Sequence, residues 1–154
     1  MSVNDFFCDH IKKNFSYTPT PCQNTLFDTL SSFTMQHDEC DIMVVNGYAG
    51  TGKTSAIAAY VKTLKEFEIK FKLMAPTGRA AKVLAGYTGY SSLTIHKQIY
   101  RQKSSADVMS KFTLDFNKAN DTVYIVDEAS LISIDSPGSL FGSGNLLMDL
   151  VQYV

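Results

Sequence analysis

The feature that most constrains this chain is the stretch NGYAGTGKTSAIAAYVK, residues 46–62. Gly47, Gly52, Lys53 and Thr54 satisfy the pattern G-x-x-x-x-G-K-[ST], with an apolar run before it and helical periodicity after it. Glycines let successive backbone N–H groups turn toward one point without clashes between Cβ atoms, and the start of a helix adds a positive end. The pattern therefore predicts a phosphate-binding loop; the alternative is a glycine-rich hairpin or a helix cap.

The loop pattern predicts a different role for each of two of its residues. Lys53 is expected to reach the β- and γ-phosphates as a catalytic residue, and the Thr54 hydroxyl is expected to ligate Mg²⁺. A nucleoside triphosphate with Mg²⁺ is the expected ligand, and the absence of an N-K-x-D motif disfavours GTP. The loop residues predicted to bind the nucleotide are Gly47, Ala49, Gly50, Thr51, Gly52, Lys53, Thr54 and Ser55.

A second candidate site lies in VYIVDEAS, residues 123–130. The apolar run is typical of a buried strand, and it carries Asp127 and Glu128 to the carboxyl end, where open α/β sheets bind their ligands. Asp127 is expected to hold Mg²⁺ through a water, and Glu128 is the expected catalytic base that orients and deprotonates the attacking water. The alternative is a strand followed by an acidic helix cap.

The pattern along the chain alternates helices and strands. Apolar spacing and breaker residues predict helices that begin near Ser2, near Gln23 and at Lys53, short helices at 78–86 and 94–102, and a last helix at 145–154. Buried strands are expected at 41–47, 70–76 and 121–128, a half-exposed strand at 110–117, and a loop at 136–144. This alternation predicts an α/β fold with a parallel sheet.

Length and composition limit the class of protein. The 154 residues fit one domain, and the net charge of −1 provides no global basic field for nucleic acid, although a local basic strip is allowed. No run approaches the length of a membrane span, and the N-terminus shows no secretory signal. The three cysteines form no close pair. A cytoplasmic location with no membrane contact is therefore expected.

Four segments in this order, GYAGTGKTS, MAPTGRAAKVL, TIHKQIY and VYIVDEASLI, resemble the first motifs of superfamily 1 DNA helicases, most closely the RecD-like branch that moves 5′ to 3′. The resemblance covers about Cys22 to Ile134. It implies a P-loop NTPase, RecA-like parallel sheet flanked by helices and incomplete at the C-terminus, with N-terminal helices at 1–40 and a partial ATPase lobe at 41–154. It also implies ATP and Mg²⁺ as cofactors and hydrolysis coupled to translocation on single-stranded DNA and unwinding.

The resemblance assigns roles to further residues. Gln23 matches a glutamine that contacts adenine; its alternative is an exposed residue in the first turn of a helix. Pro76, Thr77 and Arg79 match a segment that binds single-stranded DNA, where Thr77 and backbone N–H groups can hold a phosphate. The alternative is a basic helix face in water. His96 matches a position near the DNA path, or is a partly buried helix histidine.

Parts of such a helicase are missing from the sequence. No glutamine sensor motif follows the acidic strand, and the two arginines, Arg79 and Arg101, both precede it. A second RecA-like lobe is therefore the expected partner, and the chain is expected to be the front of a first lobe. Two alternatives remain open: another P-loop ATPase of the AAA+ type, and a nucleotide-binding module without turnover.

Overall fold

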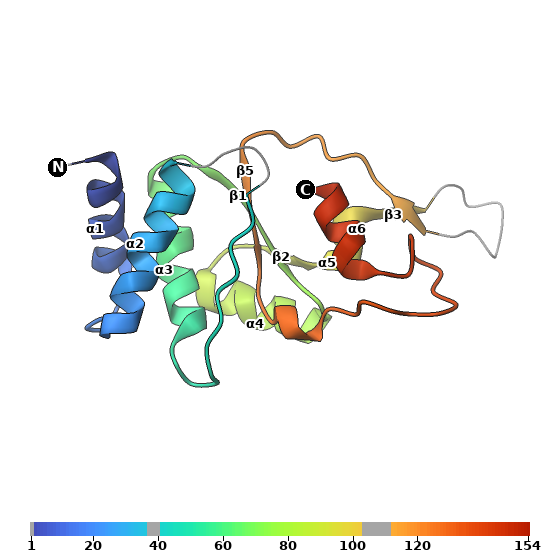
Figure 1. Cartoon of the computed structure of the whole chain (residues 1–154), viewed down its shortest axis with the longest axis horizontal. Helices are drawn as coiled ribbons and strands as arrows, with labels where there is room; N and C mark the ends of the chain where they lie inside the picture. Colours follow the sequence, from blue (N-terminus) through green and yellow to red (C-terminus); the bar gives the residue numbers. More distant parts are fainter. Residues whose placement is uncertain (1, 37–40, 103–111) are drawn as a thin grey trace. The chain divides into compact units, whose positions relative to one another are not determined.

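A computed structural model describes residues 2–36, 41–102 and 112–154 of the chain (Figure 1). It divides into two compact units. The helical unit comprises Met1–Phe71 and Tyr87–Gly89, and the sheet unit comprises Lys72–Gly86 and Tyr90–Val154. In the described part of the chain, no helix has both the length and the apolar character that crossing a membrane requires.

The helical unit is built from three helices, α1 (Val3–Asn14), α2 (Pro21–Met35) and α3 (Lys53–Glu66). The first two start with the same device. Ser2 accepts from the N–H of Asp5 while its own N–H donates to the Asp5 carboxylate, and Thr20 and Gln23 repeat this capping box at α2. Each box satisfies two N–H groups that a helix start leaves without an intrahelical partner. The three predicted helix starts are confirmed.

The apolar faces of these helices form the core of the helical unit. Phe7, Phe27 and Leu64 are fully buried, and the Phe7 ring meets that of Phe67 edge-on at 4.8 Å between centroids. The apolar spacing of α1 predicts a core face made of Val3, Phe6, Phe7 and Ile11. This face is only partly right, because Phe7 and Ile11 are buried but Val3 and Phe6 are exposed, while Cys8 is buried. The 3.6-residue period locates an apolar stripe but not its edges.

The buried strand expected at residues 41–47 is wrong. In the part of the chain that the structure describes, this segment joins no sheet, and Ile42 and Val44 are 70% and 84% exposed. An apolar run bounded by turn signals is consistent with a strand, but the pattern says nothing about whether a neighbouring strand is present to pair with it.

A parallel three-stranded sheet in the order β2-β1-β5 is formed by β1 (Lys70–Ala75), β2 (Ser92–Thr94) and β5 (Thr122–Val126). All of its residues except Lys70 and Phe71 belong to the sheet unit. Met74 of β1 lies opposite Leu93 of β2, and the carbonyl of Met74 accepts from the N–H of Asp127 just after β5. The predicted α/β class with a parallel sheet flanked by helices is therefore confirmed. However, β5 is half-buried along its whole length rather than buried.

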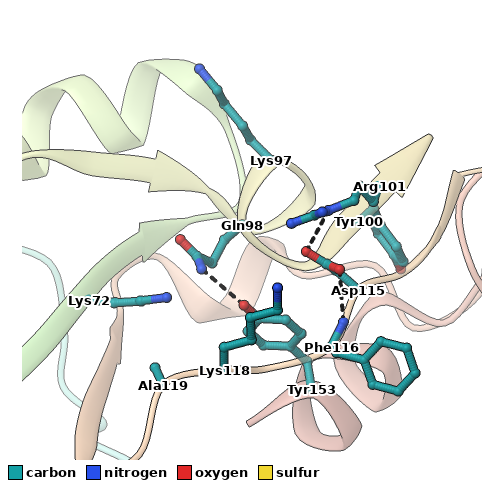
Figure 2. Close-up of a pocket in the computed structure, with 10 residues that line it drawn as sticks. All are labelled: Lys72, Lys97, Gln98, Tyr100, Arg101, Asp115, Phe116, Lys118, Ala119 and Tyr153. Atoms are coloured by element: carbon teal, nitrogen blue, oxygen red, sulfur yellow. Dashed lines mark hydrogen bonds and ion pairs between the residues drawn. The ribbon is translucent and has the colours of Figure 1, made fainter. Parts of the chain in front are cut away.

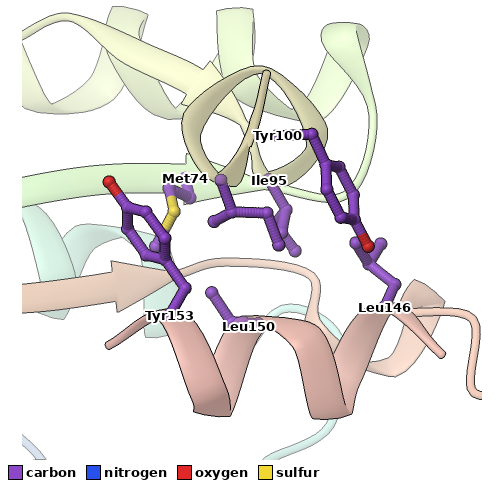
Figure 3. Packing of buried hydrophobic residues seen from close by; sticks show 7 residues of the cluster. Met74, Ile95, Tyr100, Leu146, Leu150 and Tyr153 are labelled. Carbon is purple, nitrogen blue, oxygen red and sulfur yellow. The ribbon is translucent and has the colours of Figure 1, made fainter. Parts of the chain in front are cut away.

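Within the sheet unit, the apolar side of helix α6 (Leu146–Tyr153) packs against β1 and α5 (Ile95–Ile99) (Figure 3). Leu146, Leu150 and Tyr153 meet Met74 and Ile95 in one buried cluster, and half-buried side chains of β5 extend it. The cluster joins segments more than fifty positions apart in the sequence and positions the carboxyl end of β5.

A buried carboxylate ties the start of α6 to the loop before it. Asp149, 4% exposed, accepts hydrogen bonds from the Tyr100 hydroxyl at 2.5 Å, from the Ser143 hydroxyl at 2.7 Å and from the Ser143 N–H at 2.9 Å. We call this arrangement the Asp149 latch. Charge-assisted hydrogen bonds of this kind are stronger than neutral ones.

Two predicted elements differ in extent. The helix expected at 94–102 is only α5 (Ile95–Ile99); it is followed by β3 (Tyr100–Gln102), which pairs antiparallel with β4 (Phe112–Leu114). Helix α4 (Gly78–Thr88) passes through Gly86, the expected stop, because an interior glycine costs only about 1 kcal/mol. The strand expected at 110–117 is confirmed at its centre, and residues 110 and 111 lie outside the described residues.

Candidate functional site

The loop that precedes α3 folds around the side chain of Lys53. Its Nζ donates to the carbonyl oxygens of Gly47 at 2.6 Å and Tyr48 at 2.7 Å. The Thr51 hydroxyl also donates to the Tyr48 carbonyl at 2.9 Å. The loop therefore closes around its own lysine, whose positive charge lies beside the backbone of Gly47 and Tyr48.

Glycine is required at the end of this loop for two reasons. Gly52 has φ of 81°, in the left-handed region, and a Cβ there would lie 2.8 Å from Nε2 of Gln23. Gly52 is also the N-cap of α3 and supplies no side-chain hydrogen bond to the helix. The first N–H groups of an α-helix lack intrahelical partners, so this uncapped start presents donors to an anion.

The residues present fit a phosphate group. Lys53 supplies the charge, the uncapped start of α3 supplies backbone donors, and the glycines leave room for close approach. Thr54 and Ser55 lie half-buried in the first turn of α3, whereas Ala49, Gly50 and Thr51 lie exposed in the loop. The structure thus brings the sequence-predicted loop residues together in one turn.

Gln23 joins this loop from the start of α2. Its Nε2 donates to the Thr51 carbonyl at 3.0 Å, and its Oε1 accepts from the Thr20 N–H at 3.0 Å. Both ends of the amide are therefore used, one to cap α2 and the other to hold the loop. The sequence analysis predicted neither the capping of α2 by Gln23 nor its contact with the loop. The spacing T-x-x-Q of residues 20–23 would have signalled the capping box, but nothing in the sequence signals the contact with Thr51.

Asp127 and Glu128 lie in the sheet unit, immediately after β5. The Asp127 carboxylate accepts from the Glu128 N–H at 2.9 Å, and its side chain is half-buried while that of Glu128 is exposed. Glu128 has φ of 56° in the left-handed region. Among the described residues, no group of three or more His, Cys, Asp or Glu side chains is placed to hold a metal. A metal held here would need additional ligands from the nucleotide or from water.

The predicted DNA-binding segment follows β1. Thr77 caps α4: its hydroxyl accepts from the Ala80 N–H at 3.2 Å, and its carbonyl accepts from the Ala81 N–H at 3.0 Å. Pro76 is half-buried, and Thr77 and Arg79 are exposed. Thr77 and Asp127 follow β1 and β5, so both lie at the carboxyl edge of the sheet.

His96 lies apart from that segment, on α5. Its ring packs edge-on against Phe141, with 4.9 Å between centroids, and lies 5.7 Å from the ring of Tyr100. Burial in this aromatic setting lowers the pKa of His96, because desolvation disfavours the charged form. The geometry supports the alternative of a partly buried helix histidine.

Comparison with protein families matches residues 29–143 to an AAA domain, within a P-loop NTPase family that includes RecD-like superfamily 1 helicases. An uncharacterised protein of Methanocaldococcus jannaschii is similar, with 29% identity over 122 residues that cover 72% of this chain and 10% of that protein. This chain therefore spans a tenth of the length of that relative. No solved structure was found to match.

Proposed function

Because the chain belongs to this AAA-domain family of P-loop NTPases, we propose that it binds and hydrolyses Mg·ATP as the first lobe of a DNA motor. The motor is a superfamily 1 helicase of the RecD-like branch, and it acts on single-stranded DNA together with a second RecA-like lobe. The family supports the ATPase part. The helicase part rests on the four sequence motifs and on the fact that the family includes RecD-like superfamily 1 helicases.

One observation carries the ATPase proposal: the Lys53 ammonium lies against the carbonyls of Gly47 and Tyr48, directly before an uncapped helix. A lysine charge at a helix start that has no side-chain cap is a combination that suits binding of a triphosphate. In the proposed mechanism Lys53 neutralises charge on the β- and γ-phosphates, and this neutralisation is worth most in the transition state.

The acidic pair supplies the remaining chemistry. Asp127 is proposed to hold a water of the metal shell, and Thr54 to ligate the metal; the metal would polarise the phosphate oxygens. Glu128 orients the attacking water and takes its proton. Its exposed carboxylate, one residue beyond the half-buried Asp127, is consistent with that division of roles.

The DNA part of the proposal is supported by the segment after β1. The exposed Thr77 and Arg79 follow the strand beside β5 and lie at the same edge of the sheet as the acidic pair. A nucleic-acid strand bound at that edge would contact the element from which Asp127 and Glu128 project. This arrangement provides a direct route for coupling hydrolysis to DNA.

The test is isothermal titration of Mg·ATP into the parent chain and into two variants of α3. Lys53→Ala should lose about tenfold or more in affinity, because it removes a charge-assisted contact with the phosphates. Lys62→Ala removes the same charge from an exposed position later in the helix and should bind like the parent. Equal affinities of Lys53→Ala and the parent would refute the ATP site.

A second measurement separates the helicase from other P-loop ATPases. Phosphate release should rise when oligo-dT is added to the chain, because the motor couples hydrolysis to DNA. Hydrolysis that ignores oligo-dT, with the Lys53 site intact, would favour an ATPase that acts on a different partner. Binding of ATP with no hydrolysis, even when DNA and a separate second lobe are supplied, would favour a module without turnover.

A further inference from the structure

The sheet unit has a cavity of about 520 Å³ with a basic lining (Figure 2). Four cationic side chains line it, Lys72, Lys97, Arg101 and Lys118, against one carboxylate, Asp115. The chain as a whole carries a net charge of −1, so this lining is a local excess of positive charge. Such a surface attracts an anion even though the whole molecule does not.

The positive charges of this basic cavity are not all neutralised by ion pairs with carboxylates of the described residues. Arg101 pairs with Asp115 through Nε at 2.8 Å, so its two terminal nitrogens are not part of that contact. Lys72 lies 5.8 Å from the centre of the Tyr124 ring, an arrangement that keeps its charge. Within the part of the chain that the structure describes, Lys97 and Lys118 form no ion pair, and both are exposed.

An exposed aromatic ring stands beside these charges. Phe116 is 85% exposed, and its N–H donates to the Asp115 carboxylate at 2.9 Å. The same carboxylate therefore holds both the Phe116 backbone and the Arg101 head group. Gln98 and Tyr153 share a hydrogen bond of 3.2 Å and add polar groups to the lining. An exposed phenylalanine next to cations offers a face on which a base can stack.

The basic cavity is distinct from the proposed hydrolytic edge of the sheet. Lys72 lies in the first half of β1, and Lys118 precedes β5. Because these neighbouring strands are parallel, their amino ends share one edge of the sheet, and Thr77 and Asp127 follow the carboxyl ends at the other.

We propose that the basic cavity binds a segment of single-stranded nucleic acid, with phosphates on Lys97, Lys118 and Arg101 and a base on Phe116. The proposal rests on the proposed function for its choice of ligand, but it assigns a contact that the predicted residues after β1 do not make. Cations that follow the backbone beside an aromatic platform give binding that tolerates any base sequence.

The experiment measures the fluorescence anisotropy of a labelled 15-nucleotide oligo-dT with the whole chain, without ATP and over a range of salt concentrations. Lys97→Ala and Lys118→Ala should each weaken binding several-fold and reduce the salt slope by about 0.7, the share of one phosphate contact on a single strand. Phe116→Ala should weaken binding by about fivefold or more, with the salt slope unchanged.

The matched control is Lys65→Ala, which removes one exposed charge from α3 in the helical unit. It should leave both affinity and slope as in the parent. Inorganic polyphosphate serves as a ligand with phosphates and no bases, and it should bind the parent and Phe116→Ala equally. Thermal melting of each variant excludes loss of fold as the cause of weaker binding.

Three outcomes would overturn the site. They are failure of the parent to bind oligo-dT, binding by the cavity variants as tight as that of Lys65→Ala, and an unchanged affinity in Phe116→Ala. The last outcome would mean a site for phosphate alone. The titration of Lys53→Ala with Mg·ATP contains no DNA, so failure of the cavity and failure of the ATP site are read separately.

Discussion

Glu128 combines an unusual backbone with a chemically suitable side chain. Its φ of 56° falls in the left-handed region, which non-glycine residues adopt rarely and at a cost of order 1 kcal/mol. Two other described non-glycine residues share this feature, Glu68 and Asp121, and neither belongs to a predicted site. The strained backbone turns the chain sharply after Asp127, and at this position it supports the role of base proposed for Glu128.

The first prediction at this scale concerns the charge of Glu128. Glu128→Gln keeps the size of the side chain but cannot accept a proton, so in a full-length context turnover should fall by roughly 10²–10⁴ while ATP affinity is retained. Phosphate release and isothermal titration on the same preparations measure the two quantities. Turnover within about threefold of the parent would mean that another group is the base.

At the scale of elements, the start of α2 is fastened to the loop before α3. Gln23 caps its own helix and donates to the Thr51 carbonyl, so a shift of α2 would pull on the phosphate-binding loop. Because the hydrogen bond already restricts the loop, the loop loses less conformational entropy when a ligand binds. Contact with adenine remains a prediction from the resemblance.

Two substitutions at Gln23 test this coupling. Gln23→Ala removes the hydrogen bond to Thr51, worth about 0.5–1.5 kcal/mol, and should weaken Mg·ATP binding by about two- to tenfold. Gln23→Glu keeps an acceptor for the Thr20 N–H but places a carboxylate oxygen against the Thr51 carbonyl, so it should bind ATP more weakly than Gln23→Ala. Titration calorimetry gives both affinities; the reverse order would show that Gln23 does not hold the loop.

The Asp149 latch makes the stability of the sheet unit depend on pH. Burial alone would raise the pKa of Asp149, but the hydrogen bonds from Tyr100 and Ser143 together outweigh it, and the pKa is lowered. A lowered pKa means that the latch stabilises the fold above the unfolded-state pKa of about 4 and that this contribution is lost as the pH falls.

Replacement of this carboxylate should show the same dependence. Asp149→Asn keeps the shape but weakens the charge-assisted bonds, so it should lower the free energy of unfolding by about 1–3 kcal/mol at pH 7. Urea unfolding at pH 7 and near pH 3 measures the difference between variant and parent at each pH. A difference that does not shrink at the lower pH would contradict the proposed source of the stability.

For the whole molecule, the sequence predicts well those features that depend on interactions between residues close together in the chain. The capping box at Ser2 and Asp5, the loop before Lys53 and the apolar run of β5 are each decided by residues a few positions apart. Their positions in the structure agree with the predictions. The parallel sheet followed from the alternation of such elements, since parallel strands need helical crossovers.

What the sequence did not predict depends on contacts between distant segments. The contact of Gln23 with Thr51 joins residues 28 positions apart, and the Asp149 latch spans 49 positions to Tyr100. The missing strand at 41–47 has the same origin, because pairing needs a partner that a local pattern cannot supply. The basic cavity likewise gathers three lysines and one arginine from three separate stretches of the chain.

The exposed apolar segment predicts how the chain behaves at high concentration. Ile42 and Val44 lie outside any helix or strand with most of their surface in water, and exposed apolar residues of this kind favour intermolecular pairing. Val44→Lys should therefore raise the concentration at which self-association appears in sedimentation velocity. Val83→Lys, on the exposed side of α4, is the control and should change it less. Equal effects would mean that general charge, not this segment, governs association.

The Asp149 latch also restricts which substitutions are tolerated in the loop of residues 136–144 that precedes α6. Gly142 has φ of 45°, and a Cβ on it would overlap the Asp149 carboxylate and the Tyr100 ring. Gly138, in the same loop, has φ of 80° but open space around it. Random mutagenesis of residues 136–144 should therefore recover asparagine or aspartate at 138 and glycine alone at 142. The substitution spectrum of this short loop would report the position of a carboxylate that belongs to the following helix.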